Sequence, residues 1–347
     1  MSSTGRDPRA HAITQERART GEARPDATVS VANPLLVRDT VRDTRPPRHE
    51  AIANLEQLPE RDRRALHTLV QLRLLTYHQL RSAAYSTAHP SVTRRRITQL
   101  ARLGLVSTWE QPSRSGGHTR YAIPTGPAVR AVTAALAREA SGAPFAPLMQ
   151  LMLPATTRRA LTLAPGTRPN WLPHQTEVNT LVLRLREVRR LVWASTWDCP
   201  FPSRVASFEL PQPDYVLVES HAAGLRLVFG EHDRGSEPVE RFIARKVLAY
   251  AALSAFPEAC ARYFGVPALT VQITVTDPVH RSPLRRLNDL ILATRRAAGA
   301  DAARIFSFTL AGWLHAAPGE PIWLASHDDV RHESLNWRDH AARDSST

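Results

Sequence analysis

The chain has 347 residues, of which 43% are hydrophobic and 22% are charged, and this length allows two domains that each bury a core. Its 45 basic and 32 acidic residues give a formal net charge of +13, which favours a polyanionic partner, above all nucleic acid. No apolar run reaches the roughly 18 residues of a spanning helix and no signal-peptide core is present, so we expect no membrane partner. Two cysteines, Cys199 and Cys260, are too few for a disulfide framework or a thiolate metal site, so we expect a location in the reducing cytoplasm.

Residues 1–50 are rich in Arg, Asp, Thr, Pro and Ala and show no sustained apolar period. We interpret this segment as a disordered basic tail. Its role would be either that of a nonspecific DNA-binding arm or that of a plain linker.

Residues 55–140 show the signals of three helices, a hairpin and a fourth helix. The first helix begins beside Pro59, Thr76 caps the second, and the third runs from an N-cap at Ser91 to Gly104. Strands at 105–109 and 121–123 flank a glycine-rich tip, and an alanine-rich helix follows at 127–140. This order predicts a winged helix-turn-helix domain.

The third helix presents long polar side chains outward, while Ile97 and Leu100 mark its inner face. A helix that enters the major groove needs such donors on its outer face, and a glycine-rich wing can follow the phosphates. The alternative is a solvated basic face of a protein-interaction domain. The predicted DNA-binding residues are Arg94, Arg95, Gln99 and Arg102 on the helix, and Arg114 and Arg120 at the wing.

Residues 141–173 contain six prolines and form the expected linker. A second domain, at 174–325, begins with an amphipathic helix and continues with strands at 191–197, 214–218 and 225–231, a helix at 238–256, a strand at 269–276, a helix at 283–297 and a strand at 305–310. The order αβββαβαβ predicts an α/β or α+β domain in which the first three strands form a meander and the fourth pairs across after a helix. Residues 326–347 are expected to form a polar tail.

Acidic residues in this domain suggest a site for a divalent cation. Asp214 opens one strand and Glu231 closes the next, so both fall at the same end of an antiparallel pair, and Asp233 shares the face of Glu231 if the strand continues. Glu177 on the preceding helix is a fourth candidate. Converging carboxylates repel one another unless a cation lies among them, and their oxygen atoms suit Mg²⁺ or Mn²⁺. We therefore predict these four residues as metal ligands.

Lys246 is the single lysine of the protein, and it lies in phase with Ile243 and Tyr250 on the expected sheet-facing side of its helix. An ammonium group beside a metal and a scissile phosphate stabilises developing charge or holds the attacking water. The predicted catalytic residues are Asp214, Glu231, Asp233 and Lys246. The alternative is a salt bridge from Lys246 to Asp233 or Glu231 without a metal.

Residues 213–214, residues 231–233 and the helix lysine resemble the PD-(D/E)xK core of restriction-endonuclease-like proteins, whose order αβββαβ matches residues 174–276. In the usual pattern, lysine stands two residues after the acidic strand residue. This chain has Asp233 there, so the resemblance implies that Lys246 acts from the helix.

The chain also resembles the replication-relaxation proteins of plasmids and integrative elements over about residues 55–315. The family motif R-D-x-x-x-L corresponds to residues 61–66, and R-R-L-x-x-L-x-x-x-G-L corresponds to residues 95–105. The family's second-domain motif, P-D, E-x-D-R-G and K-x-x-x-Y, corresponds to residues 213–214, 231–235 and 246–250.

This resemblance implies work on the DNA of mobile elements. Part of the family is related to restriction-endonuclease-like relaxases, which nick one strand at a transfer origin with a divalent metal, so it implies catalytic roles for Asp214, Glu231, Lys246 and Asp233. The implied partners are double-stranded DNA at a plasmid or transfer origin and other relaxosome or replication proteins. We also consider a second copy of the chain as a partner.

Other chemistries find no support in the sequence. None of the 14 histidines forms the His-apolar-His run of histidine-metal relaxases, although His232 could assist as a base. No phosphate-binding Walker loop and no nucleophile elbow are present, so a helicase is not expected. The alternative function is that of a non-catalytic regulator or relaxosome accessory protein, in which the nuclease-like domain only dimerises or holds a partner.

Overall fold

The computed structural model describes residues 55–112, 116–140, 169–189, 191–196, 204–205, 208–209, 212–221, 224–266, 268–276, 282–316 and 323–325. The chain divides into Met1–Arg45 and Pro46–Thr347, and every described residue belongs to the second unit. The expected tails at 1–50 and 326–347 and most of the expected linker lie outside the described residues. Within the described ranges, no helix is long and apolar enough to cross a membrane.

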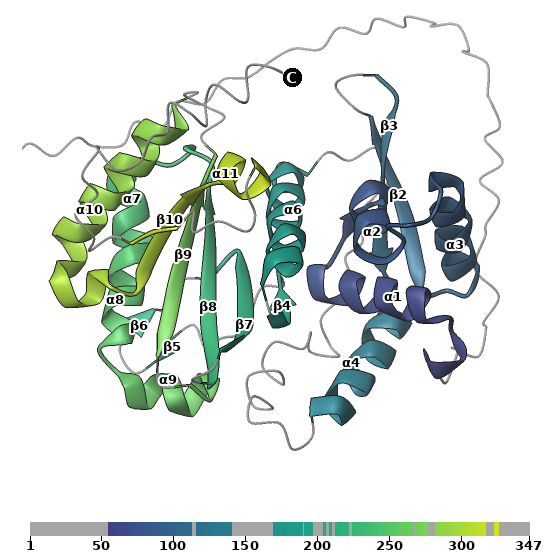
Figure 1. Cartoon of the computed structure of the whole chain (residues 1–347), viewed down its shortest axis with the longest axis horizontal. Helices are drawn as coiled ribbons and strands as arrows, with labels where there is room; N and C mark the ends of the chain where they lie inside the picture. Colours follow the sequence, from purple (N-terminus) through teal and green to yellow (C-terminus); the bar gives the residue numbers. More distant parts are fainter. Residues whose placement is uncertain are drawn as a thin grey trace, which may run out of the picture. The chain divides into compact units, whose positions relative to one another are not determined.

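The described residues form a mixed α+β structure with a small antiparallel sheet and a mixed six-stranded sheet (Figure 1). The N-terminal elements follow the predicted order of three helices, a hairpin and a fourth helix, and they add a short strand, β1, which pairs with β3 to complete a sheet of order β1-β3-β2. These elements are η1 (Leu55–Gln57), α1 (Glu60–Leu72), β1 (Leu75–Thr76), α2 (Tyr77–Ala84), α3 (Pro90–Arg102), β2 (Val106–Pro112), β3 (His118–Pro124) and α4 (Gly126–Ala140).

Local sequence signals explain how these helices begin and end. Thr76 caps α2 with a complete capping box, because its hydroxyl accepts from the Gln79 N–H and the Gln79 side chain accepts from the Thr76 N–H. The N-cap predicted at Ser91 is wrong: α3 begins at Pro90, and the cap is His89. Proline has no N–H to leave unpaired, and its fixed φ suits the first helical position, so the helix starts at Pro90 rather than after Ser91. Gly104, with φ of 71°, follows the end of α3.

The remaining described elements build the six-stranded sheet, a separate two-stranded sheet of β5 and β6, and the surrounding helices. Strands β4, β7 and β8 form the predicted antiparallel meander, and β8, β9 and β10 are parallel. Strand β11 pairs antiparallel with β10, which gives the order β11-β10-β9-β8-β7-β4. The elements are α6 (Leu172–Val188), β4 (Leu191–Ser195), β5 (Arg204–Val205), β6 (Phe208–Glu209), β7 (Tyr215–His221), β8 (Gly224–Asp233), α7 (Val239–Phe242), the π-helical turn η2 (Ile243–Val247), α8 (Leu248–Ser254), α9 (Pro257–Phe264), β9 (Leu269–Val275), α10 (Pro283–Ala303), β10 (Phe306–Leu310), α11 (Ala311–Ala316) and β11 (Leu324–Ala325).

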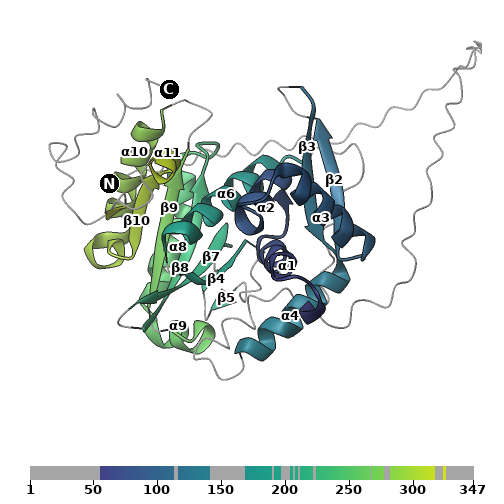
Figure 2. The same ribbon diagram turned by 45° about the vertical axis from the view of Figure 1, so that its right-hand side comes forward.

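The six-stranded sheet has helices on both faces: α6 lies on one face, and α7, α8 and α10 lie on the other (Figures 1 and 2). The period of two along β8 divides its side chains between these layers. Phe229 stacks on Tyr250 of α8 at 5.6 Å between ring centroids. His232, three residues later and therefore on the opposite face of the strand, contacts Glu177 of α6. Polar residues at the end of β8 therefore face two different sets of helices.

The beginning of α6 is buried against the N-terminal elements. Leu172 belongs to a buried cluster with Leu74, Trp109, Tyr121 and Ile123. Helix α6 thus starts two residues before the expected start of the second domain, and its first turn packs on the small sheet.

Candidate functional site

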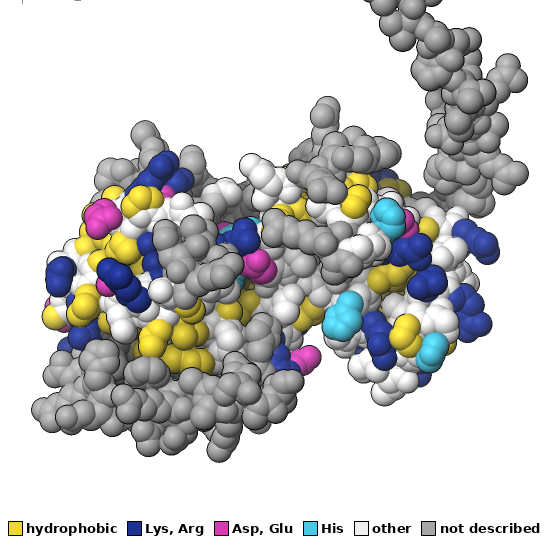
Figure 3. Space-filling view, turned by 90° about the horizontal axis from the view of Figure 1, so that it is seen from above, with side chains coloured by type: hydrophobic (Ala, Val, Ile, Leu, Met, Phe, Trp, Pro, Cys, Tyr) yellow, Lys and Arg dark blue, Asp and Glu magenta, His cyan; other side chains and the backbone are white. Residues whose placement is uncertain are grey.

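The outer face of α3 is the first candidate site. Arg94, Arg95, Gln99 and Arg102 are all exposed, and Thr93, Ile97 and Leu100 on the opposite side are buried. Figure 3 shows Lys and Arg side chains, in dark blue, gathered on its right-hand side, over the N-terminal elements. The alternation of buried apolar and exposed basic positions gives a helix face that can contact DNA phosphates and base edges.

Of the two residues predicted at the wing, the structure describes Arg120 but not Arg114. Arg120 of β3 pairs with Glu110 of β2 across the ladder, with 2.6 Å between Arg120 Nε and Glu110 Oε1. Arg114 lies outside the described residues. Arg120 therefore needs to exchange or share its partner if it is to bind a phosphate.

A buried ion pair fixes α3 against α1. Asp62 of α1 is 1% exposed and accepts hydrogen bonds from both Arg96 of α3 and the Tyr85 hydroxyl, the latter at 2.9 Å. The hydrogen bond with Asp62 raises the pKa of Arg96, although its burial acts in the opposite direction. Arg96 is thus the arginine of the third helix that has a structural partner, whereas its neighbours Arg94 and Arg95 project to solvent.

Asp214 and Glu231 converge at one end of the β7–β8 pair, as the strand order predicted. The Asp214 backbone N–H donates to the Gly230 carbonyl at 2.9 Å, and the His232 N–H donates to Asp214 Oδ2 at 2.7 Å. Antiparallel pairing places Tyr215 opposite Gly230, so the residues that flank this pair, Asp214 and Glu231, become neighbours.

Lys246 joins these two carboxylates from the helix layer. Its Nζ lies 2.9 Å from Glu231 Oε2 and donates to the Gln212 carbonyl at 2.7 Å. Tyr250, four residues later, donates from its hydroxyl to Glu231 Oε1 at 2.6 Å. The π-helical turn at Ile243–Val247 contains Lys246, and a single π turn changes the direction of side chains in an otherwise α-helical segment.

Asp233 shares a face with Glu231, because β8 continues to Asp233, but it binds a different partner. Arg286 of α10 donates two hydrogen bonds to the Asp233 carboxylate, at 2.7 and 3.0 Å, and a third to the Glu237 carbonyl. This bidentate pair is buried on both sides. Asp233 therefore ties β8 to α10.

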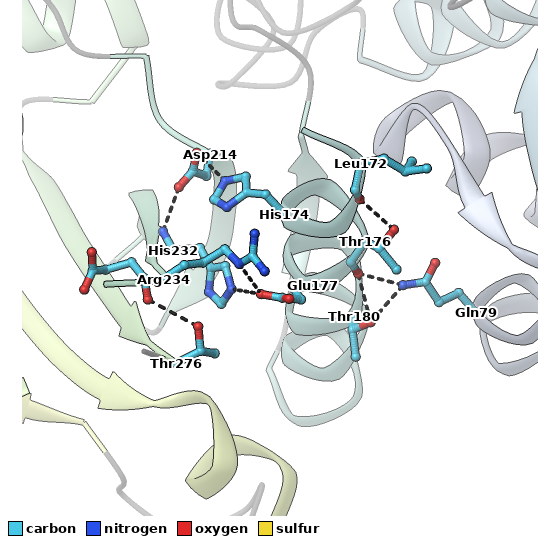
Figure 4. Close-up of polar contacts among 11 residues, drawn as sticks. Gln79, Leu172, His174, Thr176, Glu177, Thr180, Asp214, His232, Arg234 and Thr276 are labelled. Carbon is cyan, nitrogen blue, oxygen red and sulfur yellow. Dashed lines mark hydrogen bonds and ion pairs between the residues drawn. The ribbon is translucent and has the colours of Figure 1, made fainter. Parts of the chain in front are cut away.

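Glu177 lies on the opposite side of β8, where α6 faces the sheet (Figure 4). Its Oε2 is 3.0 Å from His232 Nε2 and 3.1 Å from Arg234 Nε. His174, one turn earlier on α6, reaches Asp214 with 3.0 Å between Nε2 and Oδ1. Asp214 thus connects the groups on the two faces of the sheet: His174 on the α6 side and Lys246 on the α8 side.

The surroundings shift several pKa values. Burial raises the pKa of Glu231 to about 7, and the nearby Lys246 charge opposes this rise. Although burial acts the other way, the hydrogen bond with His174 lowers the pKa of Asp214. Despite their burial, the charges of Glu231 and Asp214 raise the pKa of Lys246, and Asp214 raises that of His174. The group combines an acid that is easily protonated with one that stays ionised.

The four predicted metal ligands do not share one position. Asp214 accepts from His174 and His232, Glu231 from Lys246 and Tyr250, Asp233 from Arg286, and Glu177 contacts His232 and Arg234. Among the described residues, no group of three or more His, Cys, Asp or Glu side chains is placed to hold a metal ion. In this arrangement the residues do not fit a common divalent cation.

The sequence did not identify several of the residues that contact the predicted acids. Tyr250 carried a signal, since its spacing of four from Lys246 places both on one helix face. His174 and Arg234 were visible as neighbours of Glu177 and Asp233 in the chain, but not as their contacts. Arg286 gave no local signal, because its partner lies 53 residues away in the chain.

Comparison with known proteins gives one family. A family model described as replication-relaxation matches residues 66–269, which is more than half of the chain and contains α3, Asp214, Glu231 and Lys246. No curated protein and no solved structure matches the chain significantly.

Proposed function

Because the chain belongs to the replication-relaxation family, we propose that it is a cytoplasmic protein that binds double-stranded DNA in the replication or mobilisation of a plasmid or integrative element. The observation that supports DNA binding best is the exposed basic face of α3, above a buried layer that holds the helix in place. The net charge of +13 supports the same partner, because basic side chains that neutralise phosphates release counterions.

The proposal assigns two fold identities. The elements from α1 to β3 act as a winged helix-turn-helix, with α3 as the recognition helix, a reading supported by their order and by the β2–β3 hairpin. The elements from α6 to β9 act as a PD-(D/E)xK-like core, a reading supported by the antiparallel meander and the parallel β9.

Duplex binding is tested with the full-length protein and two matched double variants. Arg95→Ala with Arg102→Ala removes two exposed side chains of α3, and we expect at least a tenfold loss of affinity for duplex DNA. Arg241→Ala with Arg285→Ala removes the same charge from α7 and α10, where the side chains are 66% and 85% exposed, and should leave affinity unchanged. Equal affinity of the first variant and the wild type would refute the role of α3.

A second function, nicking of one DNA strand, is proposed for the cluster of Asp214, Glu231 and Lys246. The observation in its favour is that the two carboxylates and the single lysine of the chain meet at one end of the sheet. In this role Lys246 holds the attacking water or stabilises charge on the phosphate. Dependence on Mg²⁺ or Mn²⁺ belongs to this proposal, and binding of the ion would have to displace the present donors to the carboxylates.

Nicking is tested on supercoiled plasmid that carries the origin of the element, with Mg²⁺, with Mn²⁺ and with EDTA. The proposal expects relaxed product only with metal, and loss of that product in Asp214→Ala and Lys246→Ala while duplex binding persists. Arg285→Ala serves as the control. If the wild type shifts this DNA in a gel but yields no metal-dependent cleavage, the protein is instead a regulator or relaxosome accessory protein.

The proposed protein partners are other relaxosome or replication proteins and a second copy of the chain. Light scattering of the purified protein, with and without origin DNA, measures its mass directly. A mass of one chain under both conditions would exclude the homodimer.

A further inference from the structure

The cluster around Asp214 is balanced in charge, which is unusual for a site that has to attract a cation. Glu177, Asp214 and Glu231 are its acids, and each lies in contact with at least one basic side chain. Those basic residues are His174, Arg234 and Lys246. Since each carboxylate already has a basic partner, a divalent cation would have to displace that partner in order to bind here.

Side chains of both signs are partly accessible in the cluster. The basic side chains of His174, Arg234 and Lys246 are 32%, 28% and 19% exposed. Among the acids, the side chains of Glu177 and Asp214 are 38% and 25% exposed, whereas that of Glu231 is 2% exposed. A ligand that approaches this end of the sheet therefore meets the donors of His174, Arg234 and Lys246, beside the carboxylates of Glu177 and Asp214, before it reaches Glu231.

Arg234 is held in a geometry that suits a phosphate. It directly follows β8, and Gly235, with φ of 67°, turns the chain after it in a conformation that glycine adopts without strain. The ion pair with Glu177 is made through Nε, and Figure 4 shows the guanidinium between the His174 ring and the Glu177 carboxylate. A guanidinium held through Nε can still direct its two terminal nitrogens to two oxygens of one phosphate.

We propose that His174 and Arg234 form a binding site for a backbone phosphate of DNA beside Asp214, and that this site works without a divalent cation. The site holds the strand by its phosphate, so it does not discriminate among bases. Because the site lies next to Asp214, Glu231 and Lys246, a strand bound there lies beside both carboxylates. This inference rests on the proposed function in DNA binding and adds a second contact, separate from α3.

The test uses the full-length protein, a fluorescein-labelled single-stranded 20-mer and a buffer with EDTA. A single strand offers no major groove to α3, so it reports on the phosphate site. We expect His174→Gln and Arg234→Gln each to weaken binding about fivefold or more, and to lower the slope of log K against log salt by about 0.7 for each lost contact. Arg184→Gln is the matched control, because Arg184 lies on α6 but pairs with Glu187.

Equal affinity of His174→Gln, Arg234→Gln and the wild type for the 20-mer would overturn the site, and so would an equal loss in Arg184→Gln. If His174→Gln and Arg234→Gln weaken binding of the 20-mer only when Mg²⁺ is present, the site depends on the metal and the proposal is wrong on this point. Arg234→Lys keeps the charge but lacks the planar guanidinium, so its affinity for the 20-mer is expected to lie between those of the wild type and Arg234→Gln. This variant replaces Arg234→Gln in the test if the glutamine variant does not fold. Duplex binding by the α3 double variant is measured in parallel, so failure of the phosphate site and failure of the α3 interface remain distinguishable.

Discussion

At the scale of single residues, the approach of β7 to β8 depends on one glycine. A Cβ atom built on Gly230 would lie 1.9 Å from Cζ of Tyr215, whose ring is buried. Gly230 and Tyr215 are paired across the ladder, directly beside Glu231 and Asp214. The absence of a side chain at residue 230 therefore allows the ring to lie on the strand while the two acids converge.

Gly230→Ala is expected to lower the free energy of unfolding by about 3 kcal/mol, because the tyrosine ring or the strand has to move. Urea unfolding followed by circular dichroism measures it. Gly312→Ala is the control, since a Cβ there meets nothing within 4 Å, and it should be close to neutral. Similar stabilities of the two variants would show that Tyr215 does not occupy this position.

The buried Glu231 should make stability depend on pH. Its pKa in the folded protein is about 7, above the ordinary value of 4.5, so the folded state holds the proton more tightly than the unfolded state. Stability from this group is fully present below about pH 4.5 and is lost as the pH rises through about 7.

Glu231→Gln removes this titration and otherwise keeps the shape of the side chain. The free energy of unfolding of the wild type, measured relative to Glu231→Gln in EDTA, should therefore fall by roughly 3 kcal/mol between pH 5 and pH 8, at about 1.4 kcal/mol per pKa unit. Unfolding in urea at both pH values measures the difference. A difference that stays constant with pH would contradict the raised pKa.

At the scale of elements, α3 is positioned by charge as well as by its apolar face. The exposed arginines of α3 depend on the orientation of the helix, and Asp62 fixes that orientation through Arg96. The motif at residues 61–66 thus has a physical role: Asp62 binds Arg96 and Tyr85, and Leu66 is fully buried.

Asp62→Ala is expected to destabilise the protein by about 3 kcal/mol, because the guanidinium of Arg96 and the hydroxyl of Tyr85 lose a buried acceptor. Glu60→Ala, two residues earlier in α1, removes only exposed pairs with Arg63 and Arg64 and should cost no more than about 1 kcal/mol. Thermal unfolding compares the two variants. Equal effects would show that the Asp62 pair does not hold α3.

Sequence patterns predicted the elements whose signals are local. Thr76 signalled the start of α2, and strand direction alone brought Asp214 and Glu231 to one end of the sheet. The two-residue strands β1 and β11 have no period long enough to detect, so they were missed. The pairing of Asp233 with Arg286 could not be predicted either, because it depends on how α10 packs on the sheet.

At the scale of the whole molecule, α6 contacts both the N-terminal elements and the cluster at the end of β8. Its Thr176 and Thr180 accept hydrogen bonds from Gln79 of α2, at 2.9 and 2.8 Å, while His174 and Glu177 reach the cluster at the end of β8 (Figure 4). Asn179, which is fully buried, donates to the Leu74 carbonyl. A single helix thus links the N-terminal elements to Asp214, and α3 and Asp214 belong to the same folded unit.

The central claim is that the protein binds duplex DNA through the basic face of α3. The most direct test is the salt dependence of duplex binding by the full-length protein. Arg95→Ala with Arg102→Ala should lower the slope of log K against log salt by about 1.8, at roughly 0.9 for each phosphate contact. Arg241→Ala with Arg285→Ala should leave the slope at its wild-type value. An unchanged slope in the α3 variant, or an equal fall in both variants, would contradict the claim.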